Sequence, residues 1–337
     1  MLVRRVITTV VMEDSYPDYA IEVTNVARKN NAHLVRRLLA ESGDHDAAIL
    51  FGAAGFGERY SDLVAAAILG RRGRTVLLTE CIWEPSSRTF ERLLGFRAQR
   101  SHDRGPRQRR AFRAAVRMID APSVHYCVES TYELASFPNL WGVDPRRVHF
   151  TPFCYFVDTS RPATTTSGSV FAGGDSLRDY RALLTAAPSI DAKVVVATHL
   201  PIEDAPANVV AGPLTRERYD EEFRSASVIV VPLVKDSLRT GGQQTYLSAM
   251  ALGKPLVITD SPGVRDYVQH RETGLIVRPD DPAELAAAVR WLLDPANATE
   301  VDAMTSRARE VAQTNYSREA YLGRVFDLVN TLTGAGQ

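Results

Sequence analysis

The chain alternates between short apolar runs rich in β-branched residues and longer stretches of helical periodicity, and it does so in two successive series. Such alternation is typical of βαβ units, in which helices cover both faces of a parallel sheet. The expected strands of the first series lie at 5–12, 47–54, 74–81 and 123–130, and those of the second at 169–175, 193–198, 207–213, 227–232, 254–260 and 274–279. We therefore predict an α/β protein with two doubly wound parallel sheets.

The expected helices lie between these strands, at 61–70, 178–187, 216–226, 243–253 and 264–270, and three more helical segments follow the last strand, from 281–294 to 317–332. A stretch rich in Thr, Ser, Pro and Gly near 157–168 separates the two series and suits a hinge. With 337 residues, the chain is long enough for two domains. We place them at 1–160 and 161–316, with a final helical segment at 317–337.

The composition bounds the class of protein. Hydrophobic residues make up 45% and charged residues 24%, and no apolar run approaches the roughly 18 residues of a membrane span. The first strand lacks the cleavage site of a signal peptide, and Cys81, Cys127 and Cys154 show no metal-ligand spacing. These features predict a protein of the reducing cytoplasm without a membrane helix.

Two glycine turns are the first candidates for ligand binding. Gly241 and Gly242 precede the helix expected at 243–253, and a helix start exposes backbone N–H groups that suit a diphosphate. Gly173 and Gly174 follow the strand at 169–175 and permit close backbone approach. Each pair alone is better explained by a simple turn. Together, at the carboxyl ends of strands in one sheet, they describe one nucleotide pocket.

The runs 245–268 and 273–289 closely resemble the donor-binding segment of glycosyltransferase family 4, and the resemblance extends over about 168–293. It implies a retaining enzyme of the GT-B type, in which two Rossmann-like domains face a cleft and the later domain binds a nucleoside-diphosphate sugar. It also implies that the helix at 317–332 packs back on the N-terminal domain.

The resemblance also assigns residues to the donor. In that family two glutamates eight positions apart contact the sugar and the ribose, and Thr240 and Ser248 occupy those places here. A basic residue after the first strand of the later domain holds the diphosphate, which implies this role for Arg178, since a guanidinium grips two phosphate oxygens at once. The full donor set is Gly173, Gly174, Arg178, Thr198, Gly241, Gly242, Gln243, Gln244, Thr245 and Ser248.

Within 168–293, where the resemblance places the donor site, no Asp-x-Asp motif and no cluster of His, Cys and Asp at metal-ligand spacing occurs. We therefore predict neither a required metal nor a cofactor besides the nucleotide-sugar co-substrate. Arg178 and the helix-end amides are expected to neutralise the leaving diphosphate.

The sequence gives weaker signals for the residues that bind the acceptor than for those that bind the donor. Gly52, Gly55 and Gly57 lie between a strand and a helix, where they form either a tight turn or part of a binding site. We predict acceptor contacts from Gly55, Gly57 and Glu84, and catalytic roles for Asp14, His102 and Thr240. Other polar candidates for the acceptor's proton are Glu80, Asp103 and Glu129. We expect the acceptor itself to be a small molecule, a glycan or a lipid-linked molecule.

A segment rich in arginine crosses the first series. Residues 97–117 carry eight arginines and a single acidic residue, Asp103, and 106–119 reads as an amphipathic basic helix. Its basic face, Arg107–Arg117, is either simply solvated or is attracted to an anionic membrane or a phosphate-bearing acceptor. Nucleic acid is not expected as a partner, because the patch is local and the net charge is zero.

Two other functions remain open at this stage. A non-catalytic nucleotide-sugar-binding protein fits the missing glutamate pair, and an epimerase of the GT-B type acts on the nucleotide sugar without an acceptor. A dehydrogenase is not expected, because no Gly-x-Gly-x-x-Gly run with a ribose-binding acid follows a strand.

Overall fold

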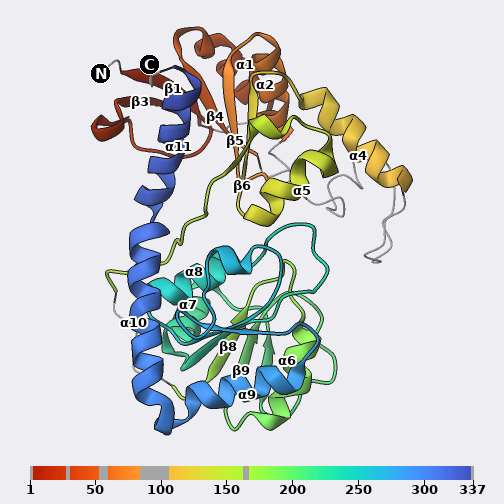
Figure 1. Ribbon diagram of the computed structural model, residues 1–337, viewed down its shortest axis with the longest axis vertical. Coiled ribbons are helices and arrows are strands. Elements are labelled where there is room, and N and C mark those ends of the chain that lie inside the picture. The colour runs from red at the N-terminus through yellow and green to blue at the C-terminus, as the bar shows by residue number, and fades with distance from the viewer. Residues whose placement is uncertain (1–2, 28–30, 53–59, 84–105, 162–166, 335–337) are drawn as a thin grey trace. The chain divides into compact units, whose positions relative to one another are not determined.

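The computed structural model describes residues 3–27, 31–52, 60–83, 106–161 and 167–334. They form two compact units: Met1–Pro152 with Tyr321–Gln337, called the first unit, and Phe153–Ala320, called the second unit. The divisions at 152/153 and 320/321 compare with the predicted 160/161 and 316/317. Each unit contains one sheet (Figure 1).

The sheet of the first unit has the strand order β2-β3-β1-β4-β5-β6-β7. Only β2 is antiparallel to its neighbour. Strand bounds are Arg4–Thr8 for β1, Ser15–Tyr16 for β2, Ile21–Asn25 for β3, Ala47–Phe51 for β4, Thr75–Thr79 for β5, Val124–Val128 for β6 and Val148–Phe150 for β7. The strand predicted at 5–12 ends early because Val10 N donates to Thr8 Oγ1 at 2.9 Å, which turns the chain out of the sheet. Strands β2, β3 and β7 were not predicted.

The helices of the first unit are α1 (Asn31–Glu41), α2 (Tyr60–Arg71), α4 (Pro106–Ile119) and α5 (Thr131–Trp141), joined by α11 (Arg318–Leu332) from Tyr321 onward. Ser130 accepts the Glu133 amide at the start of α5, and Gly142 ends that helix in a left-handed conformation. Phe326 of α11 packs on Tyr16 and Tyr19, with ring centroids 4.6 and 5.6 Å apart. The end of the chain thus contributes to a core built near its beginning.

The sheet of the second unit is wholly parallel, with the order β10-β9-β8-β11-β12-β13. Strand bounds are Val170–Gly173 for β8, Val194–Ala197 for β9, Val209–Gly212 for β10, Val228–Val231 for β11, Leu256–Thr259 for β12 and Leu275–Val277 for β13. All six predicted strands are confirmed. The chain moves outward from β8 to β10 and then returns to the other side of β8, so the topological switch point lies between β8 and β11.

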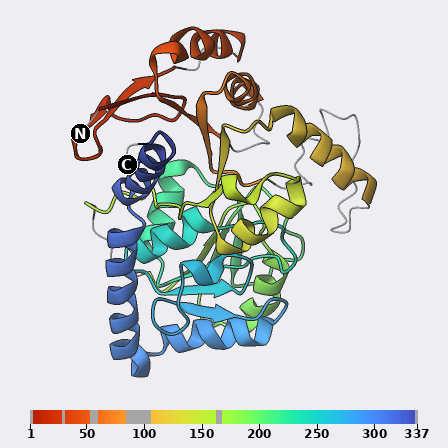
Figure 2. The same ribbon diagram turned by 45° about the horizontal axis from the view of Figure 1, so that its top comes forward.

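Helices cover both faces of this sheet. Ile229 and Val231 face a core shared with α7 (Arg216–Ser225), α8 (Gln243–Ala251) and α10 (Ala298–Asn315). Val228 and Val230 face a core shared with α6 (Tyr180–Ala186) and α9 (Pro282–Leu293). Helices α9 and α10 meet at a sharp corner (Figure 2), where Pro295 begins a single 3-10 turn. Strands buried on both faces explain the continuous apolar runs of this half.

The helix predicted at 264–270 is wrong. Only a 3-10 turn, Val264–Asp266, forms there, although Val264, Tyr267 and Val268 are buried. Their spacing mimics a helix face, but Gln269 N donates to Thr273 Oγ1 at 2.9 Å and the chain turns directly into β13.

Among the described helices, none is both long and apolar enough to cross a bilayer.

Candidate nucleotide site

The turn after β8 wraps around the Arg178 guanidinium. Arg178 Nε donates to Gly173 O at 3.0 Å, and its Nη1 donates to Ser176 O at 2.8 Å. Gly174 has a φ of +106°, and a Cβ built there would lie 2.8 Å from Arg178 Nη2. Glycine is therefore required at this position, both for the backbone conformation and to leave room for the guanidinium.

The second glycine turn meets the same guanidinium. Gly242 has a φ of +80° and occupies the N-cap position of α8. A Cβ built on it would lie 3.4 Å from Arg178 Nη1, and Arg178 Nη2 donates to Thr245 Oγ1 in the first turn of α8 at 3.0 Å. The structure thus brings Gly173, Gly174, Arg178, Gly242 and Thr245 together at the carboxyl ends of β8 and β11. This is the switch point of the sheet, where doubly wound proteins bind ligands.

No described carboxylate forms an ion pair with Arg178, although that of Asp175 is close enough to favour its charged form. All three of its hydrogen bonds go to neutral acceptors. Burial lowers the pKa of Arg178, since removal from water disfavours the charged form. A half-buried cation of this kind, beside the positive end of a helix, is suited to an anion.

The remaining predicted donor residues differ in whether they contact the turn after β8. Thr198 follows β9 and donates to Asp175 Oδ1 at 2.6 Å, so its hydroxyl is directed at the β8 turn. Gly241 packs on Leu177 of the same turn, 2.8 Å from a built Cβ to Leu177 Cδ1. Gln243 and Ser248 are buried and Gln244 is exposed.

Thr240 is a special case among them. It is 0% exposed, and its Oγ1 has no hydrogen-bond partner among the residues that the structure describes. A buried hydroxyl without a hydrogen-bond partner lowers the stability of the folded protein. Because Thr240 is fully buried, a ligand could hydrogen-bond to this hydroxyl only after the loop moves.

Several polar groups of the site were missed from sequence. Arg239 Nη2 donates to Ser176 Oγ at 2.8 Å and its Nη1 to Thr240 O at 3.0 Å, so a second guanidinium joins the β8 turn. Tyr180 donates from its hydroxyl to Gly174 O at 2.6 Å. A basic residue directly before Thr-Gly-Gly was a signal that could have identified Arg239.

The structure does not bring the predicted acceptor-binding and catalytic residues of the first unit together among the residues that it describes. Asp14 is exposed, between β1 and β2. Glu80 directly follows β5 with a φ of 55°, and Glu129 is buried after β6. Gly52 is buried at the end of β4, where a Cβ would lie 2.6 Å from Thr79 O. Gly55, Gly57, Glu84, His102 and Asp103 lie outside the described residues.

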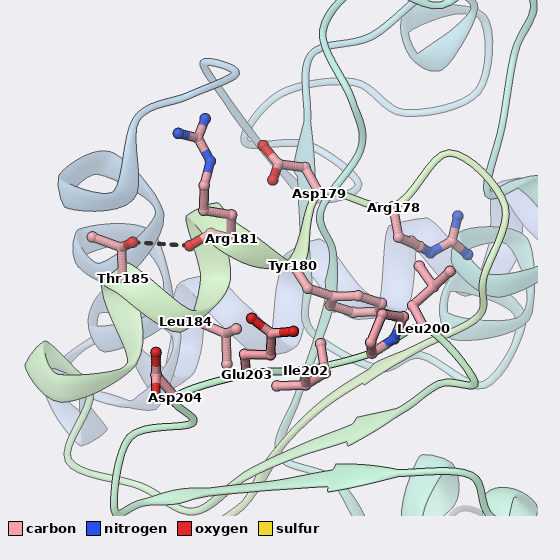
Figure 3. A pocket seen from close by; sticks show the side chains of 11 residues that line it. Arg178, Asp179, Tyr180, Arg181, Leu184, Thr185, Leu200, Ile202, Glu203 and Asp204 are labelled. Carbon is pink, nitrogen blue, oxygen red and sulfur yellow. Dashed lines mark hydrogen bonds between the residues drawn. The ribbon is translucent and has the colours of Figure 1, made fainter. Parts of the chain in front are cut away.

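A cavity of about 500 Å³ adjoins Arg178 in the second unit (Figure 3). One wall comes from the β8 turn and α6, and the other from Leu200–Asp204, which follow β9. Figure 3 shows Arg178 at one end, with Asp204 and Thr185 toward the other. Its volume lies within the range of small-molecule sites in proteins.

Comparison with known proteins shows which proteins the chain resembles. Residues 177–295 match the family described as Glycosyl transferases group 1. A D-inositol 3-phosphate glycosyltransferase of Acidothermus cellulolyticus is 35% identical over 91 residues, which are 27% of this chain and 19% of that relative. The matched part thus spans about a fifth of the relative's length.

Solved structures resemble the chain over most of its length. HepE of Anabaena, in complex with UDP and glucose, matches with a TM-score of 0.64 and 13% identity, covering 92% of this chain and 86% of that one. Sucrose-phosphate synthase of Thermosynechococcus elongatus matches with a TM-score of 0.60 and 18% identity, covering 96% and 86%. At such identities the likeness establishes the fold. The chain therefore has the GT-B fold, and over residues 177–295 it resembles the group 1 glycosyl transferases.

Proposed function

We propose that the chain is a glycosyltransferase that moves a sugar from a nucleoside-diphosphate donor to an acceptor nucleophile. The observation that carries this proposal is the convergence of two glycine turns on the Arg178 guanidinium, which hydrogen-bonds to neutral groups. The UDP bound in the HepE structure supports a nucleotide-sugar donor. The acceptor is a small molecule, a glycan or a lipid-linked molecule.

The chemistry follows from where charge develops. When the bond from the sugar to the diphosphate breaks, negative charge grows on the leaving phosphate oxygens. In this proposal, further N–H groups of Arg178 and the first amides of α8 stabilise that charge and so lower the barrier to bond cleavage. In this proposal the protein's own donors neutralise the diphosphate, and the reaction needs no metal.

We further propose membership of glycosyltransferase family 4, with retention of anomeric configuration. The ordered match of 177–295 to the group 1 glycosyl transferases supports this assignment. Thr240 and Ser248 stand where that family has glutamates, so hydroxyl groups take the place of carboxylates at the sugar and the ribose.

The function is tested by product analysis. We expect the purified chain to release nucleoside diphosphate from at least one of UDP-, GDP- or ADP-glucose when candidate acceptors are present, with the same rate after addition of EDTA. NMR of the product is expected to show the donor's anomeric configuration. Donor binding without any release would instead indicate a binding protein, and a changed sugar without release of nucleotide would indicate an epimerase.

We also propose that α4 lies against an anionic membrane surface. Arg110, Arg117 and the 63% exposed Met118 are presented to solvent, whereas Val116 packs into the core. Arg113 is engaged with the carbonyls of Asn139 and Leu140 on α5 and is not available in the same way.

This contact predicts an effect of charge reversal. The double variant Arg110→Glu with Arg117→Glu is expected to bind phosphatidylglycerol vesicles at least about 30-fold more weakly than the unmodified chain in a sedimentation assay, because each of the two basic residues near such a surface contributes about 1 kcal/mol. Equal sedimentation of both proteins would contradict the contact. Uncharged phosphatidylcholine vesicles serve as the control for both.

A further inference from the structure

Asp175 and His199 form a pair at the carboxyl ends of β8 and β9. Asp175 Oδ1 accepts hydrogen bonds from Thr198 Oγ1 at 2.6 Å and from the His199 amide at 2.8 Å. Asp175 Oδ2 lies 3.0 Å from His199 Nδ1. Burial alone would raise the pKa of Asp175, but the hydrogen bonds from Thr198 and His199 outweigh it and lower this pKa. The carboxylate is therefore ionised and fixed in orientation.

The carboxylate determines the tautomer of His199. Because an ionised carboxylate only accepts hydrogen bonds, Nδ1 of His199 carries the proton that it shares with Asp175. In the neutral imidazole, Nε2 is then an acceptor. The His199 side chain is 76% exposed, so this acceptor is presented to solvent on an oriented ring. The backbone amide and Thr198 already hold Asp175, so the ring is not needed to anchor the carboxylate.

The pair lies next to the proposed diphosphate site. Asp175 directly follows Gly174, whose turn encloses Arg178, and neighbouring strand ends are about 5 Å apart. A nucleoside attached to a diphosphate at Arg178 must extend toward one side of the switch point. On the β9 side, the cavity begins at Arg178 and continues along Leu200–Ile202, which directly follow His199 (Figure 3). This side offers both space and an oriented acceptor.

We propose that His199, oriented by Asp175, determines donor specificity by accepting a hydrogen bond from an N–H group of the nucleobase. This inference rests on the proposed function and adds which part of the donor the β9 end recognises. The base would be one with a ring or exocyclic N–H on the edge that faces His199, and the nucleoside would lie along Leu200–Ile202. His199 acts here in binding and takes no part in breaking or forming the glycosidic bond.

The test compares nucleotides with inorganic pyrophosphate, which has the diphosphate but lacks the base. Binding of UDP, GDP, ADP, CDP and pyrophosphate is measured by calorimetry for the unmodified chain, His199→Ala and His199→Gln. We expect His199→Ala to weaken binding of the preferred nucleotide about five- to tenfold, the value of one hydrogen bond, and to leave pyrophosphate unchanged. His199→Gln is expected to restore most of the loss, because its terminal amide oxygen reaches near the place of Nε2.

Lys193→Ala is the matched control, since Lys193 is exposed at the opposite end of the same strand, β9. Unchanged nucleotide binding in His199→Ala, or an equal loss for nucleotide and pyrophosphate, would overturn the role of His199 and leave the proposed function standing. An unmodified chain that binds none of the nucleotides would overturn the proposed function itself. A melting curve of each variant without ligand confirms that the comparison is made on folded protein.

Discussion

Replacing Arg178 with alanine is expected to weaken binding of a nucleoside diphosphate by about 2 to 3 kcal/mol, or roughly 30- to 150-fold. The guanidinium lies between the two glycine turns and bears the charge that the diphosphate neutralises. Its removal deletes charge-assisted hydrogen bonds and leaves the α8 amides as the main attraction for phosphate. Calorimetric titration with UDP, or the ligand-induced rise in melting temperature, measures the loss.

Arg307→Ala is the control for this variant. Arg307 lies on α10 away from the cavity, is 60% exposed in its side chain and pairs with Glu272 at 3.1 Å. Its replacement is expected to change nucleotide binding little, because exposed ion pairs contribute about 0 to 1 kcal/mol. Arg178→Lys should recover only part of the affinity, since an ammonium group cannot grip two phosphate oxygens as a planar guanidinium does. Equal affinities of Arg178→Ala and Arg307→Ala would remove Arg178 from the site.

The largest effect on stability is expected from Phe326→Ala in α11. Phe326 is fully buried and packs on Tyr16 and Tyr19, so its truncation leaves a cavity between the last helix and the start of the chain. Such replacements destabilise a domain by about 3 to 5 kcal/mol. Urea unfolding followed by tryptophan fluorescence is the measurement, because Trp83 and Trp141 both lie in the core of the first unit.

Phe156→Ala provides the comparison for this prediction. Phe156 is 51% exposed in the second unit, so the same loss of a phenyl ring there should cost far less. If the two variants unfold at the same urea concentration, α11 does not stabilise the first unit through Phe326.

The second unit was largely predictable because its strands are buried on both faces. A strand such as Val228–Val231 must be apolar at every position, and this makes it visible as a continuous run. Strand β3 in the first unit, Ile21–Asn25, carries Glu22, Thr24 and Asn25 and so lacks that signal. The helix predicted at 264–270 was wrong because a misleading signal was present. The buried side chains there have helical spacing, but the backbone of Gln269 hydrogen-bonds to Thr273 instead of continuing a helix.

The two glycine turns and Arg178 of the candidate site were predicted from the sequence, whereas several of the polar residues around them were not. Glycine pairs after a strand and before a helix have a local backbone cause, and the resemblance singled out Arg178 between them. Arg239 and the Asp175–His199 pair become parts of the site only through contacts across the sheet edge. Which loops meet at this sheet edge cannot be recognised from a single sequence, because it depends on the strand order of the folded unit.

The division of the chain into units also has a consequence for its synthesis. The second unit, Phe153–Ala320, is one uninterrupted segment, whereas the first unit needs Tyr321–Gln337 in addition to Met1–Pro152. Because translation proceeds from the N-terminus, synthesis of the first unit begins before that of the second unit but ends after it. The surface of the first unit that packs against α11 therefore stays exposed to solvent while the second unit is synthesised. During that interval the newborn chain exposes an apolar surface around Tyr16 and Tyr19 that a chaperone is expected to shield.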